Sequence, residues 1–173
     1  MSHQIIVNKL SFGTKGFDLV EKYQNGTILL IKNNSDIDNK INDLLLKLNN
    51  GDLKTLNISS NEVKKIKISQ VLTKYKLKSI SKIFVIGGGT IIDFSKRIRK
   101  EIEDNTKNQI ELYVIPSRIG SGAESSWASI VNYSHEKNIK VNNRFLPSGV
   151  IYYTKLYRSL SHLDLLEGSI DAI

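Results

Sequence analysis

The chain has 173 residues, of which 40% are hydrophobic and 24% charged, a composition that excludes wholesale disorder. It contains no cysteine, which excludes disulfides, thiolate metal sites and cysteine nucleophiles. The formal net charge of +8 is compatible with nucleic acid, but no known binding motif accompanies it, and a lysine-rich composition explains it more simply. No apolar run approaches the ~20 residues of a membrane span. We therefore expect a soluble, cytoplasmic protein with no membrane partner, and we do not favour nucleic acid as a partner.

Short apolar runs alternate with helical patterns along the chain. The runs with the length and composition of strands are 5–12, 27–31, 54–58, 83–86, 111–115, 127–133 and 150–153. Apolar residues at helical spacing predict helices within 17–23, 37–48, 63–75, 91–102 and 155–173. Ser59 and Glu62 form a potential capping box. The alternation predicts an α/β fold, a Rossmann-like and mainly parallel sheet flanked by helices.

The strongest functional signal is a run of three glycines between a predicted buried strand and a predicted helix. Residues 83–86 lead directly into Gly87, Gly88 and Gly89, and Thr90 follows. Glycines let a ligand approach the backbone, and the free N–H groups and dipole of a helix start attract phosphate. The pattern is neither G-x-G-x-x-G nor a Walker motif, and the alternative is a tight turn without a ligand. We favour phosphate binding, because three glycines exceed what a turn needs.

A second loop, rich in glycine and serine, leaves the end of another predicted strand. It reads IPSRIGSGAE over residues 115–124, and small residues and hydroxyls at such a place can line a cofactor. By contrast, Asp171 and the histidines His3, His135 and His162 show no metal-ligand spacing. From the residues alone, we therefore expect a cofactor site and no metal site.

Together, these segments resemble motifs of the iron-containing (group III) alcohol dehydrogenase family, which has a dehydroquinate synthase-like fold. The family's GGGSxxDxAK matches residues 87–96, its IPTTAGTGSE matches 115–124, and its G-[ML]-D-A-L is approximated by 169–173. The resemblance implies a nucleotide-binding domain at 1–160 and the start of a helical, metal-binding domain at 161–173. Because family members are much longer, it also implies the N-terminal part of a larger enzyme, inactive as this chain alone.

The resemblance also implies roles for individual residues. In the family, the triple-glycine turn holds the pyrophosphate of NAD or NADP, and the aspartate of that motif, here Asp93, lies near the nicotinamide. The second loop contacts the ribose, phosphate and nicotinamide of the cofactor. The cofactor-binding residues that follow from these matches are Gly87, Gly88, Gly89, Thr90, Ser117, Arg118, Gly120 and Ser121.

The helical domain of the family holds iron or zinc through one aspartate and usually three histidines, and Asp171 matches that aspartate. The metal acts as a Lewis acid on the alcohol or carbonyl oxygen during hydride transfer. Ser169 stands where the family has glycine, which weakens this match.

Two departures from the family pattern bear on ligand choice. Arg118 replaces a threonine and can meet a phosphate or an anionic substrate group, unless it is only a solvated loop residue. Asn33, next to Lys32, occupies the position of an aspartate that disfavours NADP in many members. Both NAD and NADP therefore stay open as cofactors.

Three functions remain open at this point. The first is an NAD(P)- and metal-dependent alcohol dehydrogenase that acts on a small alcohol or aldehyde, with an anionic group on that substrate left open. The second is a lyase similar to dehydroquinate or cyclitol synthases, with a phosphorylated or other anionic substrate. The third is a non-catalytic nucleotide- or nucleic-acid-binding module, for which the charge of +8 is the argument. The sequence leaves a homo-oligomer open.

Overall fold

The computed structural model of the chain describes residues 10–12, 27–33, 41, 43, 45, 53–75, 79–133, 136–158 and 160–171. The predicted helix at 17–23 and the first part of the predicted strand at 5–12 lie outside these residues. Of the predicted helix at 37–48, the described positions 41, 43 and 45 are helical.

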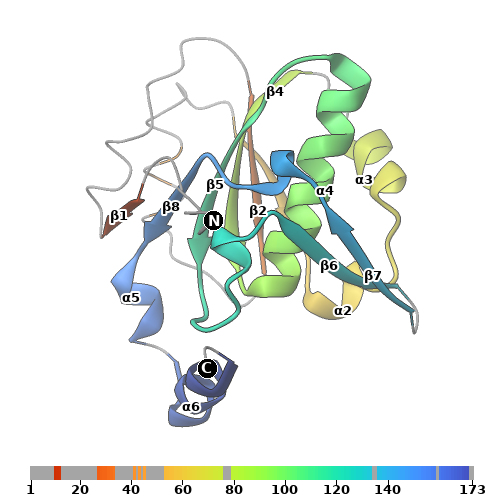
Figure 1. Cartoon of the computed structure of the whole chain (residues 1–173). Helices are drawn as coiled ribbons and strands as arrows, with labels where there is room; N and C mark the ends of the chain where they lie inside the picture. Colours follow the sequence, from red (N-terminus) through yellow and green to blue (C-terminus); the bar gives the residue numbers. More distant parts are fainter. Residues whose placement is uncertain are drawn as a thin grey trace, which may run out of the picture.

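A six-stranded sheet forms the centre of the described structure (Figure 1), and all its pairings are parallel. The strand order is β1-β8-β5-β4-β2-β3. The strands are β1 (Leu10–Phe12), β2 (Thr27–Lys32), β3 (Leu53–Asn57), β4 (Ile80–Gly87), β5 (Glu111–Pro116) and β8 (Gly149–Tyr152). This sheet confirms the predicted Rossmann-like α/β fold.

Helices form where apolar spacing predicts them, with two corrections. The α-helices are α2 (Ser60–Val63), α3 (Ile68–Tyr75), α4 (Gly89–Thr106), α5 (Thr154–Tyr157) and α6 (His162–Asp171). The sequence pattern predicts one helix over 63–75, but the structure has two, α2 and α3. Ile66 and Ile68 both pack against the core, which residues two apart on one continuous helix cannot do. The predicted helical stretch 155–173 is likewise divided, into α5 and α6.

The start of α2 confirms the predicted capping box. The Glu62 carboxylate accepts a hydrogen bond from the backbone N–H of Ser59 at 2.7 Å, and the Ser59 hydroxyl accepts one from the N–H of Glu62 at 3.3 Å. The same reciprocal pattern joins Ser161 and Asp164 at the start of α6, where it fixes the Asp164 side chain.

The central strands are buried on both faces because they are apolar at successive positions. In β2, Leu29 and Ile31 belong to the core cluster on the side of α4, which includes Phe94. Ile28 and Leu30 point to the opposite face and belong to a second cluster. This two-sided burial holds the carboxyl ends of the strands in place, and the candidate site lies at those ends.

A two-stranded antiparallel hairpin lies beside the main sheet, formed by β6 (Ala128–Tyr133) and β7 (Glu136–Val141). The sequence reasoning missed β7, because EKNIKV is polar and every one of its side chains is exposed. Arg97 of α4 holds the hairpin: it donates to the Ser129 hydroxyl at 2.7 Å and to the backbone carbonyl of Asn138 at 2.6 Å. Val131 of β6 is also buried in the core on the side of α4, so polar and apolar contacts together hold the hairpin. The polar contacts join distant segments, and no local pattern reveals them.

Candidate functional site

The carboxyl ends of three neighbouring strands, β2, β4 and β5, meet at one edge of the sheet. The backbone N–H of Asn33 donates to the Ile86 carbonyl at 3.3 Å, and that of Ser117 donates to the Gly87 carbonyl at 3.0 Å. From β2 the chain continues to β3, toward one edge of the sheet, and from β4 it continues to β5, toward the opposite edge. This edge is therefore a topological switch point, where open α/β sheets bind ligands.

The first residues of α4 leave backbone donors at this edge. Gly88 is the N-cap residue, with extended backbone and no side-chain cap. Its carbonyl accepts from the N–H groups of Ile91 and Ile92 at 3.0 and 3.1 Å. The N–H groups of Gly89 and Thr90 precede the first intrahelical donors, so they can hold an anion together with the helix dipole.

The two glycine-containing loops pack directly on each other. A Cβ atom on Gly88 would lie 3.4 Å from Cδ of Arg118, and one on Gly89 would lie 3.0 Å from Cβ of Ser121. A Cβ atom on Gly87 would meet Ile91 at 2.8 Å. The structure therefore brings the predicted residues of the two loops together, and the glycines make their close approach sterically possible.

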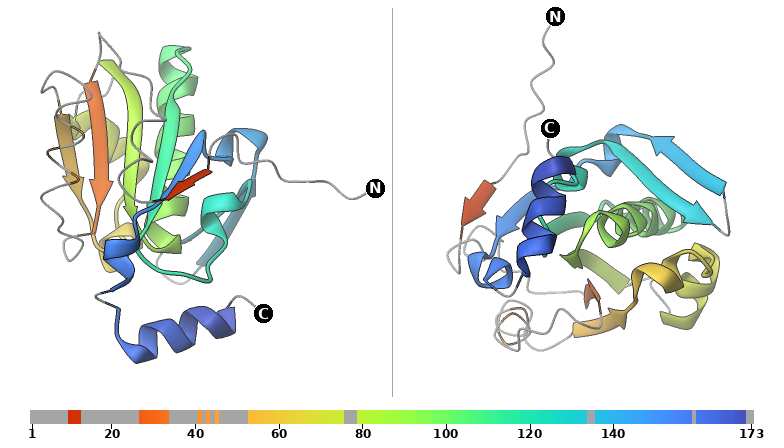
Figure 2. Two further views of the ribbon diagram at one scale, coloured as in Figure 1. Left: turned by 90° about the vertical axis from the view of Figure 1, so that its left-hand side faces the viewer. Right: turned by 90° about the horizontal axis from the view of Figure 1, so that it is seen from below.

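The second loop also packs tightly on α6, which lies across this end of the sheet (Figure 2). Gly120 has a φ of +95°, and a Cβ atom there would lie 1.9 Å from the backbone carbonyl oxygen of Gly168. Arg118 makes a second link, because its Nη2 lies 3.3 Å from Oδ1 of Asp164. Of the predicted residues, Gly120 thus contacts α6, and Arg118 contacts both α6 and Gly88 of the first loop.

Asp93 faces the hairpin and has two partners there. Its carboxylate accepts hydrogen bonds from Nζ of Lys96 at 3.0 Å and from the backbone N–H of Ile130 at 2.9 Å. The Lys96 ammonium is fully buried and also donates to the carbonyls of Ser126 and Ala128, at 2.9 and 2.7 Å. Burial lowers the pKa of Lys96, and the charge of Asp93 opposes that shift. The predicted role of Asp93 at the nicotinamide stays a prediction, and its observed contacts join α4 to strand β6 of the hairpin.

Glu124 is a site residue that the sequence reasoning did not single out. It is buried, and its carboxylate accepts from the Tyr152 hydroxyl at 3.4 Å and from the Ser121 hydroxyl at 3.5 Å. Burial and then the charge of Glu124 raise the pKa of Tyr152, and burial likewise raises the pKa of Tyr157 far above its ordinary value. The sequence held one indication of Glu124: it is the last residue of the segment 115–124, which matches the second family motif.

The predicted metal ligand, Asp171, is the exposed last residue of α6. In the part of the chain that the structure describes, no three or more His, Cys, Asp or Glu side chains gather to hold a metal ion. His162 lies at the other end of α6, and His3 and His135 lie outside the described residues. The residues that the structure describes therefore do not fit a metal site.

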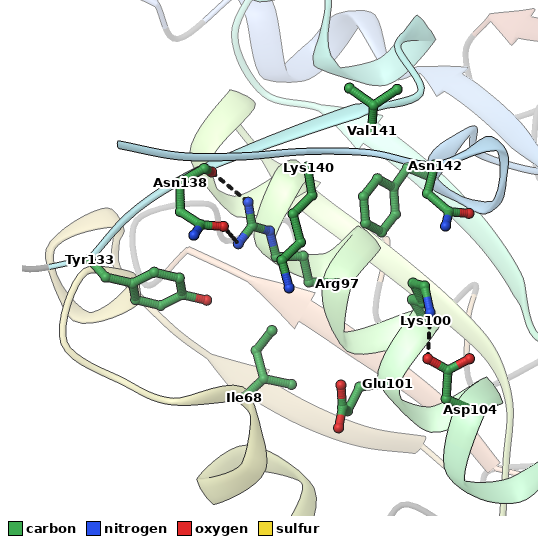
Figure 3. A pocket seen from close by; sticks show the side chains of 11 residues that line it. Ile68, Arg97, Lys100, Glu101, Asp104, Tyr133, Asn138, Lys140, Val141 and Asn142 are labelled. Carbon is green, nitrogen blue, oxygen red and sulfur yellow. Dashed lines mark hydrogen bonds and ion pairs between the residues drawn. The ribbon is translucent and has the colours of Figure 1, made fainter. Parts of the chain in front are cut away.

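A separate cavity of about 480 Å³ lies between α3, α4 and the hairpin (Figure 3). Four of its polar side chains form two pairs: Arg97 donates to Asn138 at 2.7 Å, and Lys100 pairs with Asp104. None of the predicted site residues lines it.

Among the helices described, none is long and apolar enough to cross a membrane.

The fold and the site define a Rossmann-like α/β protein whose two glycine-containing loops meet at the switch point of a parallel sheet. The sequence model of the family described as iron-containing alcohol dehydrogenase matches residues 9–154. The chain therefore belongs to the iron-containing alcohol dehydrogenase family. A comparison with curated protein sequences finds no match.

Solved structures support the same fold at low sequence identity. An iron-containing alcohol dehydrogenase from Thermococcus thioreducens matches with a TM-score of 0.80 and 18% identity, over 96% of this chain and 50% of that one. Sulfoacetaldehyde reductase from Bifidobacterium kashiwanohense, in complex with NAD+, matches with a TM-score of 0.72 and 17% identity. The match covers 94% of this chain and 49% of that one. NADH-dependent butanol dehydrogenase A from Thermotoga maritima matches with a TM-score of 0.72 and 15% identity. The match covers 95% of this chain and 47% of that one. The chain spans about half the length of these structures.

Proposed function

We propose that this chain is the cofactor-binding part of an NAD(P)- and metal-dependent dehydrogenase that interconverts an alcohol and an aldehyde. The observation that carries the proposal is the uncapped start of α4, which faces the second loop at the switch point of the sheet. Membership of the iron-containing alcohol dehydrogenase family favours this function over a lyase or a non-catalytic module.

In this proposal, the chain binds and orients the cofactor, and the nicotinamide supplies the hydride chemistry when it is bound. The N–H groups of Gly89 and Thr90 hold the pyrophosphate, and Gly87 and Gly88 let it approach the backbone. Asn33 lies at the adenosine end. The residues of the second loop that contact the ribose, phosphate and nicotinamide are Ser117, Arg118, Gly120 and Ser121.

We further propose that Asp93 acts at the nicotinamide through the loop that it positions. Its carboxylate fixes Lys96, which holds two carbonyls next to the second loop. Ser126 lies two positions beyond this loop, and the loop in turn packs on Gly89 through Ser121.

We also propose that the domain of residues 1–160 is followed by a helical unit that begins at 161. The exposed apolar side chains Leu163, Leu166 and Ile170 lie at helical spacing on α6, which suits a helix that packs against further helices. Asp171 is our candidate for one metal ligand in the complete enzyme. The described residues do not form a metal site, so no step here depends on a metal, and we expect the 173-residue chain alone to lack dehydrogenase activity.

The phosphate-binding role is tested by placing a carboxylate on the first loop. We expect Gly88→Asp to weaken NADH binding at least about tenfold, because the side chain and its charge would occupy the phosphate position. The measurement is a fluorescence titration of NADH. Gly88→Ala separates charge from bulk, since a Cβ atom there makes only ordinary contact with Arg118. Gln109→Glu, at an exposed position before β5, controls for net charge. Unchanged NADH binding by Gly88→Asp would contradict the proposal.

The adenosine end is tested at Asn33. An aspartate there accepts hydrogen bonds from ribose hydroxyls but repels a 2′-phosphate, so we expect Asn33→Asp to weaken NADPH about tenfold more than NADH. The ratio of the two dissociation constants is the measurement. Asn108→Asp, in the exposed turn after α4, adds the same charge elsewhere. An equal change for both cofactors would show that Asn33 does not face the 2′ position.

A further inference from the structure

Arg118 lies between the proposed phosphate site and a carboxylate of α6. We propose that Asp164 competes with the bound phosphate for Arg118, so that this α6 carboxylate sets the affinity of the glycine loops for their anionic ligand. The inference rests on the proposed function, and it concerns phosphate or pyrophosphate oxygens as the ligand chemistry.

The contacts of Arg118 allow its guanidinium to exchange partners. Its side chain is 61% exposed, and one nitrogen, Nη2, approaches Oδ1 of Asp164 at 3.3 Å. This is a single-point ion pair and not the two-point pairing that makes arginine–carboxylate contacts strong. The aliphatic part of the side chain crosses Gly88, where Cδ lies 3.4 Å from the position of a Cβ atom. In our proposal, rotation about the terminal torsions moves the guanidinium from Asp164 to a phosphate at the start of α4, beside Gly88.

Asp164 does not depend on Arg118 for its position or its charge. Its Oδ2 accepts hydrogen bonds from the Ser161 hydroxyl at 2.7 Å and from the Ser161 backbone N–H at 3.1 Å. These bonds are the main reason why the pKa of Asp164 lies below its ordinary value, and Arg118 adds a smaller effect. The carboxylate therefore stays ionised and in place when the guanidinium leaves, so the exchange costs little.

The backbone keeps Asp164 near the site in either state. Gly120 and Gly168 hold α6 against the second loop, independently of the ion pair. A phosphate that binds Arg118 at the start of α4 therefore meets a cation that is already paired with Asp164, and this pair has no net charge. If the carboxylate were removed, the same phosphate would meet an uncompensated cation.

The test is Asp164→Asn in the 173-residue chain, because asparagine keeps an acceptor for Ser161. We expect this variant to bind NADH and ADP-ribose about three- to tenfold more tightly in low salt, with a smaller gain at physiological salt. Glu167→Gln removes the same charge from an exposed position on α6 and should bind as the wild type does.

A double-mutant cycle shows whether Asp164 acts through Arg118. We expect Arg118→Gln to weaken ADP-ribose binding about tenfold, and Asp164→Asn to bring no gain in that background. Unchanged or weaker binding by Asp164→Asn overturns the inference, and so does a gain that persists without Arg118. If Gly88→Asp still weakens NADH binding, the proposed function survives such a result. If the wild type binds neither probe, the proposed function and this inference both fail.

Discussion

Replacement of Gly120 by alanine is expected to be the most damaging single-atom change in the second loop. The φ of +95° is unfavourable for any residue with a side chain, at about 1–2 kcal/mol. The added Cβ atom would also lie 1.9 Å from the Gly168 carbonyl oxygen, a backbone atom that moves only with α6. We therefore expect a loss of about 3 kcal/mol or more, or the separation of α6 from the loop. Urea denaturation and limited proteolysis after residue 158 measure the two outcomes.

Gly122→Ala is the matched control. Gly122 also has a positive φ, +63°, but a Cβ atom there would have no other atom within 4 Å. This variant carries the backbone strain without the collision and should lose about 1 kcal/mol. Equal losses in the two variants would show that the contact between Gly120 and Gly168 does not hold α6 in place.

Lys96→Met should produce the largest loss of stability within α4. The substitution leaves the buried Asp93 carboxylate without its cation and leaves the carbonyls of Ser126 and Ala128 without a donor. Breaking one side of a buried ion pair costs about 3–5 kcal/mol. The free energy of unfolding, from urea denaturation, is the measurement.

Lys100→Met is the control for Lys96→Met, because it removes the same functional group from the same helix. Lys100 pairs with Asp104 near the surface, where such a pair contributes at most about 1 kcal/mol. The double variant Asp93→Leu/Lys96→Met should recover part of the loss, since it no longer buries an unpaired carboxylate. A loss below about 1 kcal/mol for Lys96→Met would mean that water replaces the ammonium at little cost.

Local patterns in the sequence were sufficient for the parallel strands of the sheet and for the positions of the two loops, but not for the order of the strands. β2 and β4 are recognisable because strands buried on both faces are apolar at successive positions, and the three glycines mark the turn into α4. The capping box of Ser59 and Glu62 is also local, since both partners lie within one turn. The strand β7 was missed because it has only two apolar residues, Ile139 and Val141, and charged or polar residues fill its other positions.

The partners of the charged residues depend on the tertiary structure. Asp93, Lys96 and Arg97 belong to a helix whose sequence suggests a polar face, but they are buried under the hairpin, more than 30 positions away along the chain. Arg118 meets Asp164 because α6 returns to the second loop, and Gly120 can accept α6 because Gly168 faces it. Periodicity and turn chemistry are properties of neighbouring residues and can be read from the sequence. Ion pairs and backbone contacts between distant segments form only when the packed sheet brings those segments together.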